Sequence, residues 1–327
     1  MAATERVDRA TGGTGRRVDA AAPRNDEHPA GLAAAGERGV LRKTPGFYRR
    51  SWARLRRNRV AMVALVLFAL VALFVLSAPL VARLSGFTPY ENHLGDKLTP
   101  PLTDGYLLGS DGNGRDLLTR LAYGGQVSLM IAFLSAFATL FLGGTFGLVS
   151  GYFGGKVDIV LMRLVDVLLA VPSLPLLILI ATLYTPGPVG LALVLAGVSW
   201  AGIARIVRGE VLALRNRDYV DAARIVGAAP PRILIRHVLP NVAPLIVVFA
   251  SLAIPDLILA EAALSFLGIG VQVPLPSWGN MLGEAQQFYR TNVSNVIIPG
   301  AMIYATSLAL YLIGSGLRDA FDPRLGD

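Results

Sequence analysis

The chain has 327 residues, of which 54% are hydrophobic and only 16% are charged, and its mean hydropathy is +0.55. Since globular domains carry about 25% charged residues, this composition excludes an ordinary soluble domain and indicates a membrane protein. The net charge is +8, but the arginines stand beside apolar runs, which is typical of membrane topology signals and argues against nucleic-acid binding. With no cysteine and three widely separated histidines, the sequence predicts no disulfide and no metal site.

Two segments precede the first apolar run. Residues 1–44 are rich in Ala, Gly, Arg, Asp and Glu without an apolar period, which predicts a disordered tail and excludes a secretory signal peptide. Residues 45–59 combine basic and aromatic side chains, which suits an interfacial helix at an anionic leaflet. The arginines of this segment place the N-terminus in the cytoplasm.

The rest of the chain is predicted to contain six transmembrane helices. The first, at residues 60–82, has twenty-three residues, and at about 1.5 Å per residue it can cross a hydrocarbon core of about 30 Å. A polar extracytoplasmic loop at 83–126 separates it from a core at 127–320. The expected spans of this core are 127–150, 159–184, 191–206, 242–268 and 293–312. With a short tail at 321–327, the six spans leave both termini cytoplasmic in an all-α membrane protein.

Glycine and proline patterns refine the expected core. Gly143, Gly147 and Gly151 recur every four residues on one helix face, which lets the backbone of a second helix approach closely. Pro172 and Pro175 lie inside the third predicted span and predict a kink there.

A basic segment at residues 215–241, here called the hairpin, interrupts the apolar runs. From Arg205 to Arg236 the chain has seven arginines against three acids, which places the hairpin in the cytoplasm. A short helix at 219–226 is expected to stop at Gly227, and a second helix is expected at 231–238, ended by Pro240. Its apolar ridge and flanking arginines suit insertion into a groove on a soluble partner, and an interfacial helix lying on lipid is the alternative.

Ionisable residues at membrane depth are candidates for function because they are costly to bury. The sequence places Asp166, Asp256 and Glu261 in the predicted spans as candidates for a substrate path or an intramembrane polar site. Arg163 lies three residues before Asp166 and could pair with it on one helix face. Glu261 could either line a solvated path or hold two helices together.

Catalytic motifs are missing from the chain. The nearest approach to a nucleotide-binding Walker A loop is GYFGGK at 151–156, which is one residue short and is followed by Val157 in place of Ser or Thr. The segment DGNGRD at 111–116 lacks the acceptor spacing of a calcium loop and predicts a glycine-rich turn that caps a helix starting near Arg115. No catalytic residue is therefore predicted, and active transport would draw energy from a partner or an ion gradient.

The hairpin sequence YVDAARIVGAAPPRILIRHVLPN is similar to the EAA loop of ABC importer permeases. The matching residues are Asp221-Ala222-Ala223, Gly227 and Leu239-Pro240, with aspartate in place of the family's glutamate. Segments 107–129, 154–176, 261–282 and 316–324 resemble the C-type permease of dipeptide and oligopeptide importers. The entry to the first span at 52–65 also fits that family, so the resemblance covers roughly residues 50–325.

This resemblance implies a type I ABC importer permease in the cytoplasmic membrane. The implied partners are a second permease, two ATPase subunits that bind ATP and Mg²⁺, and an extracytoplasmic solute-binding protein. It implies that outer segments 107–120 and 272–290 dock the binding protein or gate the path. The implied ATPase-coupling residues are Tyr219, Asp221, Ala222, Ala223, Gly227, Ala228, Pro231, Arg232, Ile233, Arg236, Leu239 and Pro240.

Three alternatives stay open at this point. Related permeases of the same family carry nickel complexes or glutathione in place of peptides. A secondary transporter driven by protons through Glu261 or Asp166 is a second alternative, although the sequence has no visible inverted repeat. A membrane scaffold that recruits a soluble partner is the third.

Overall fold

A computed structural model describes residues 47–321 of the chain, with side chains from residue 51 onward. The tail predicted at 1–44 and nearly all of the tail predicted at 321–327 lie outside the described residues. Within the described range the regular structure is helical, apart from two isolated β-bridges. Five of these helices are long and apolar enough to cross a membrane, or six if one bent pair counts as a single span. The predicted all-α membrane fold is confirmed.

Twelve α-helices and two short irregular helices follow one another in the described residues. In chain order they are α1 Phe47–Arg57, α2 Arg59–Leu76, α3 Ala78–Ser85, α4 Leu117–Phe153, α5 Gly155–Ala170, α6 Ser173–Tyr184, α7 Pro188–Leu214, α8 Asp218–Ile225, α9 Pro230–Ile233, the π-helix η1 Leu234–Val238, α10 Leu239–Phe266, α11 Trp278–Ala285, the 3-10 helix η2 Gln286–Phe288 and α12 Ser294–Phe321.

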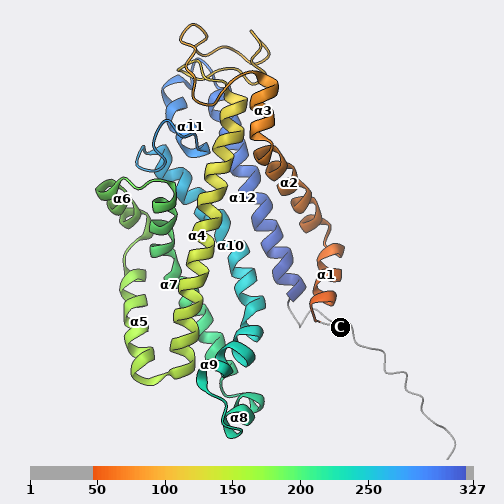
Figure 1. Ribbon diagram of the computed structural model, residues 1–327, viewed down its shortest axis with the longest axis vertical. Helices are drawn as coiled ribbons and strands as arrows, with labels where there is room; N and C mark the ends of the chain where they lie inside the picture. Colours follow the sequence, from red (N-terminus) through yellow and green to blue (C-terminus); the bar gives the residue numbers. More distant parts are fainter. Residues whose placement is uncertain (1–46, 322–327) are drawn as a thin grey trace, which may run out of the picture. The chain divides into compact units, whose positions relative to one another are not determined.

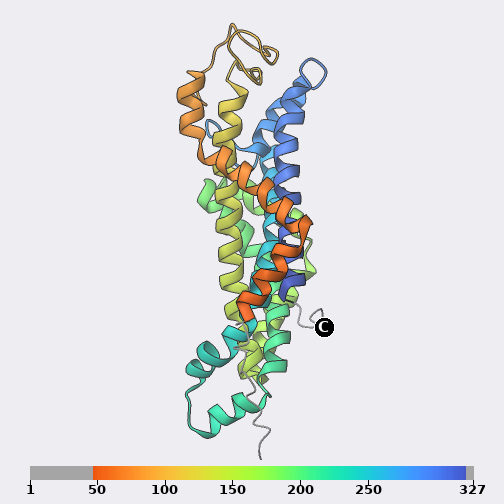
Figure 2. The same cartoon turned by 90° about the vertical axis from the view of Figure 1, so that its right-hand side faces the viewer.

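The helices α4, α7, α10 and α12 run alongside one another (Figure 1). The loop before α4 and helix α11 gather at one end of them, whereas α8 and α9 form the other end. Figure 2 shows α2 crossing the bundle obliquely, and α2 packs against α12. The main hydrophobic core joins α4, α7, α10 and α12, and the fully buried Trp278 of α11 closes it at the loop end.

Three glycines bring α4 and α7 into close contact. A Cβ atom added to Gly143 would lie 2.7 Å from the carbonyl oxygen of Trp200, and one added to Gly147 would lie 2.7 Å from that of Ala204. At Gly151 the added atom would lie 2.7 Å from Cβ of Val211. These separations are too short for a side chain, so the two helices pack backbone to backbone along this face.

Several predicted spans differ from the helices of the structure, and α7 and α12 continue to Leu214 and Phe321, beyond the predicted ends at 206 and 312. The segment predicted as one span at 60–82 is two helices, because α2 ends at Leu76 and α3 starts again with Pro79 in its first turn. Proline favours a helix start, since it has no N–H to donate to the preceding turn. Helix α4 starts at Leu117, close to the helix start predicted near Arg115 and ten residues before the span predicted at 127, because Asp116 caps it by accepting a hydrogen bond from the Thr119 N–H at 2.7 Å.

The third predicted span, at 159–184, is sharply broken. Helices α5 and α6 are bent by 88° at the short break between them, and Figure 1 shows α6 turned away from the direction of α5. Pro172 occupies the N-cap of α6, where its missing N–H interrupts no helical hydrogen bond. The predicted kink is therefore a change of direction between two short helices.

Candidate functional site

The hairpin is anchored to the long helices by a small apolar core. Val220 of α8, Ile233 of α9 and Val238 of η1 are buried together with residues of α7 and α10. From α7 and α10 this core takes Ile203, Val207, Val211 and Val242. The base of the hairpin is therefore packed directly against α7 and α10.

The outer surface of the hairpin is apolar and basic. Ile225 and Val226 at the end of α8 are each 87% exposed, and Ile235 of η1 is 67% exposed. Arg232 and Arg236 are also exposed on this second helical segment. Such a group of large apolar side chains at the tip of a hairpin is typical of a contact surface.

A glycine in the left-handed backbone conformation forms the turn between the two hairpin helices. Gly227 has φ +82°, and a Cβ added to it would meet no atom within 4 Å, so glycine is needed here for conformation and not for space. The Ala228 N–H donates to the Ala223 carbonyl at 3.0 Å and the Gly227 N–H donates to the Arg224 carbonyl at 2.9 Å. Helix α9 then starts at Pro230, with prolines in its first turn.

Asp221 is held by a neighbour on its own helix. Its carboxylate accepts a hydrogen bond from Arg224 at 2.8 Å, and both side chains remain about half exposed. The guanidinium of Arg224 also lies over the ring of Tyr152, 5.5 Å from its centroid, which ties α8 to the end of α4. The carboxylate therefore stays accessible, in a fixed orientation.

Besides Asp221, Gly227 and Ile233, six of the predicted hairpin residues lie at the surface and three are half-buried. The exposed residues are Tyr219, Ala222, Pro231, Pro240 and the two arginines, and the half-buried residues are Ala223, Ala228 and Leu239.

The structure corrects two predictions for the hairpin. Ile233 was expected on the partner surface, but it is buried in the anchoring core, and Ile225, Val226 and Ile235 occupy the outer surface. Pro240 was expected to end the second helix, but the chain continues from η1 into α10. The Leu239 N–H bonds to the Leu234 carbonyl five residues back, and this wider turn leaves room for the proline ring.

Glu261 joins three helices. It has no solvent exposure, and its carboxylate accepts hydrogen bonds from Ser128 of α4 at 2.9 Å and from Ser265 of α10 at 2.7 Å. The Ser128 hydroxyl oxygen also accepts a hydrogen bond from the backbone N–H of Trp278, the first residue of α11, at 3.2 Å. Of the two roles left open by the sequence, the structure favours holding helices together.

The other two intramembrane acids differ from each other. Asp166 of α5 pairs with Arg205 of α7 at 2.5 Å, whereas the sequence suggested Arg163 as its partner. Asp256 of α10 is exposed and lines a groove of about 490 Å³ between α10 and α12. No hydrogen bond or ion pair links Asp256 to another residue of the described part of the chain, which sets it apart from Asp166 and Glu261.

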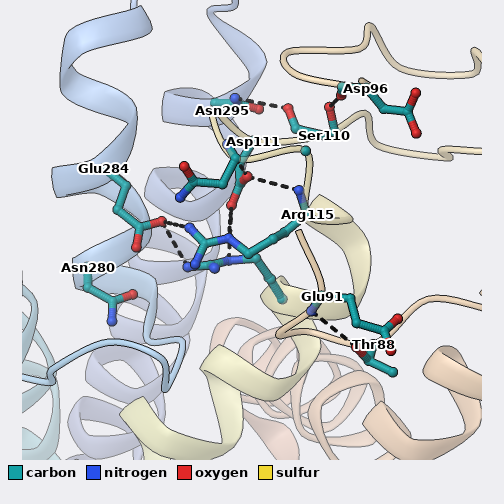
Figure 3. A network of polar contacts seen from close by, with 12 residues as sticks. Thr88, Glu91, Asp96, Ser110, Asp111, Arg115, Asn280, Glu284 and Asn295 are labelled. Carbon is teal, nitrogen blue, oxygen red and sulfur yellow. Dashed lines mark hydrogen bonds and ion pairs between the residues drawn. The ribbon is translucent and has the colours of Figure 1, made fainter. Parts of the chain in front are cut away.

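A network of four charged side chains joins the loop before α4 and the start of α4 to helix α11. Asp111 pairs with Arg115 at 2.7 Å, and Glu284 of α11 pairs with both Arg115 and Arg120, the latter at 2.9 Å. Figure 3 shows Asp111 and Glu284 converging on the Arg115 side chain. The glycine-rich turn predicted here is present, and a Cβ on Gly114 would collide with the carbonyl oxygen of His93.

The sequence had not singled out Arg120 or Glu284, which are 164 residues apart. No local pattern connects them, and only the fold brings them together. In the same loop, burial and a hydrogen bond of 3.1 Å to Asp96 raise the pKa of Tyr106 to about 12, since both favour the neutral phenol.

Two family models match the chain. Residues 143–327 match the family described as binding-protein-dependent transport system inner membrane component, and residues 46–101 match the N-terminal TM domain of oligopeptide transport permease C. The first match covers the hairpin, α7, α10 and α12, and the second covers α1, α2 and α3.

Three relatives align over most of the chain. The oligopeptide transport system permease protein OppC of Haemophilus influenzae is 37% identical over 83% of this chain and 86% of its own length. OppC of Bacillus subtilis is 35% identical over 93% of this chain and 98% of its own length. The dipeptide transport system permease protein DppC of Haemophilus influenzae is 37% identical over 84% of this chain and 94% of its own length. The chain therefore belongs to the binding-protein-dependent transport system inner membrane components and is a multi-pass inner-membrane permease.

Proposed function

We propose that this chain is the permease subunit of an ATP-driven importer for dipeptides and oligopeptides. It forms half of the translocation path, and a second, homologous permease forms the other half. Two ATPase subunits bind ATP and Mg²⁺ on the cytoplasmic side, and a solute-binding protein delivers peptide from outside. The names of the aligned relatives and the EAA-like residues 221–223 support this proposal.

The observation that carries the coupling role is the exposed tip of the hairpin. Ile225, Val226 and Ile235 project from a base that is packed against α7 and α10. Burying such side chains in a partner's groove contributes about 1.5–3 kcal/mol each, relative to leaving them in water. Arg232 and Arg236 add charge at the rim of this surface, where it guides association with an acidic partner.

Coupling then follows from how the hairpin is connected. ATP-driven closure moves the two ATPase grooves toward each other and carries both hairpins with them. Because η1 runs into α10 without a break, displacement of the tip rotates or shifts α10 as one body. Asp221 binds a basic group or a helix N-terminus on the ATPase through the part of its carboxylate that Arg224 leaves exposed.

The loop end supplies the docking platform for the solute-binding protein. Segments 107–120 and 272–290 lie there, and the four-charge network holds them against each other. A platform that is fixed to α4 and α11 allows a docked protein to sense, or to drive, the state of the helices.

The test is reconstitution of the chain with the second permease, both ATPases and the binding protein in proteoliposomes. Ile225→Ala combined with Ile235→Ala is expected to release the ATPases from the purified complex and to reduce ATP-driven peptide uptake at least about tenfold. Val63→Ala combined with Leu70→Ala is the matched control, since these side chains are exposed to a similar degree on α2. Full uptake by the hairpin variant would contradict the coupling role.

The same assay separates the alternatives. Uptake that persists without ATPases and is abolished by a protonophore would identify a proton-driven transporter. Parallel assays with labelled dipeptides, longer peptides, glutathione and nickel complexes identify the substrate. If only nickel complexes or glutathione were taken up, the permease role would stand and peptides would be excluded as the substrate.

A further inference from the structure

A groove between α10 and α12 combines apolar walls with a few polar groups. It has a volume of about 490 Å³ and is lined mainly by apolar side chains such as Leu259, Ile303 and Leu308. It also contains one acid, Asp256, and two tyrosines, Tyr304 and Tyr311. Both tyrosines are more than half exposed.

Two polar groups in this groove lack partners within the described part of the chain. The Asp256 carboxylate is exposed, and neither a hydrogen bond nor an ion pair holds it there. The Ser307 side chain is 9% exposed, and its hydroxyl has no hydrogen-bond partner. An unsatisfied buried hydroxyl is costly, so a ligand that bonds to it recovers that free energy.

The chemistry of these groups selects a cation. A carboxylate and a hydroxyl oxygen accept hydrogen bonds from an ammonium group, which has three donors. The faces of tyrosine rings attract positive charge, and the low dielectric of an apolar groove strengthens the pairing. An anion is excluded by the carboxylate, and a neutral apolar molecule would leave it unpaired.

We propose that this groove holds the protonated amino terminus of the transported peptide, with Asp256 as its counter-ion and Ser307 as a second acceptor. The proposal rests on the proposed function as a peptide permease and adds the part of the peptide that this chain recognises. The apolar walls formed by Leu259, Ile303 and Leu308 accept side chains of varied shape, because they impose no directional hydrogen bonds. The site therefore binds the positively charged amino terminus that all unmodified peptides share, and it accepts peptides of different sequence.

The location of the groove fits this role. Asp256 lies on α10, the helix that continues from the hairpin, so movement of the hairpin moves the counter-ion. The acid lies outside the tightly packed region around Glu261, which is five residues farther along the same helix. A displacement of α10 against α12 would separate Asp256 from Ser307 and release the ammonium group.

The test compares a peptide with an analogue in which a hydroxyl replaces the terminal amine. Both are supplied to the complete reconstituted importer at concentrations that saturate its binding protein. The wild-type importer is expected to transport the amine at least about tenfold faster, and Asp256→Asn is expected to bring the ratio close to one. Asp256→Glu should keep most of the preference, and Ser307→Ala should reduce it by a smaller factor.

Asp319→Asn is the matched control, because it makes the same chemical change at an exposed carboxylate on α12 outside the groove. An unchanged amine preference in both Asp256→Asn and Ser307→Ala would overturn the proposal. Loss of the second permease from the Asp256→Asn complex would also overturn it, since the acid would then pair with that subunit. Absence of any peptide uptake by the wild-type importer would instead reject the proposed function on which the proposal rests.

Discussion

Glu261 has no contact with solvent, and serine hydroxyls from α4 and α10 donate to its two carboxylate oxygens. Asp256 lies five residues earlier on the same helix and remains exposed, and no residue in the described range 47–321 donates a hydrogen bond to it. Two acids in one apolar stretch of the same helix therefore have different surroundings in the fold. At the residue scale, the number of hydrogen-bond donors separates a structural acid from one that is available to a ligand.

Replacing Glu261 tests its structural role. Glu261→Ala leaves the Ser128 and Ser265 hydroxyls without their acceptor and is expected to destabilise the protein by about 2–4 kcal/mol. Glu261→Gln keeps one acceptor oxygen and is expected to cost less. Thermal unfolding of the purified protein in detergent measures both variants. If the Glu261→Ala protein kept its stability and lost only transport, the structural role would be wrong and Glu261 would be assigned to the substrate path.

Gly227 gives a second prediction at the residue scale. A β-branched residue at φ +82° costs roughly 1–2 kcal/mol, because the left-handed conformation brings its Cβ close to the following carbonyl. We expect Gly227→Val to leave the protein in the membrane and to uncouple ATP hydrolysis from uptake, as we also expect for Asp221→Lys. Both rates are measured in proteoliposomes.

Gly155 provides the control, since it has φ +52°, has open space around its Cα and lies outside the hairpin. Gly155→Val carries a similar backbone strain, and it should retain the coupling of uptake to hydrolysis. Equal uncoupling by both variants would attribute the effect to general strain.

At the scale of elements, the tightest contact is that between α4 and α7. Its closeness depends on Gly143, Gly147 and Gly151, because each added Cβ would lie 2.7 Å from an atom of α7. The break between α5 and α6 has the opposite effect, since it turns α6 by 88° away from the direction of α5. Both features come from residues that are rare inside helices of soluble proteins, glycine and proline.

Adding one methyl group at Gly147 tests this contact. Gly147→Ala would place a carbon 2.7 Å from the Ala204 carbonyl oxygen, so the helices must separate at a cost of about 1–3 kcal/mol. Gly202→Ala on α7 is the matched control, because no atom lies within 4 Å of its Cβ, and it should be neutral or stabilising by up to about 1 kcal/mol. Thermal unfolding compares the two, and equal melting temperatures would contradict the packing role.

At the scale of the whole chain, polar and apolar contacts fasten the two ends of the long helices in different ways. The loop end is held by charges, with Arg120 only 1% exposed beside Glu284. The hairpin end is held by an apolar core around Ile233, and its outer surface is left uncovered. The first arrangement suits a platform that keeps its shape, and the second suits a surface that meets a partner.

Glu284→Gln tests the platform. The substitution removes the negative charge that two buried guanidinium groups share, and breaking such a buried ion pair costs about 3–5 kcal/mol. We expect a lower melting temperature and faster proteolysis of the loop at 86–116. Glu91→Gln, which removes an exposed acid of the same loop, should change neither. Identical proteolysis of the two variants would show that the charge network does not hold the loop.

The sequence by itself determined the membrane class, most of the apolar helices, the turn at Gly227 and the family resemblance. Each of these depends on local properties, such as apolar length, the conformational freedom of glycine and the missing N–H of proline. Only the tertiary structure decided that Ile233 faces inward while Ile225 and Ile235 face outward. It alone paired Arg120 with Glu284 and left Asp256 without a partner among the described residues, because hydrogen-bond partners far apart in the chain are chosen by how the helices pack.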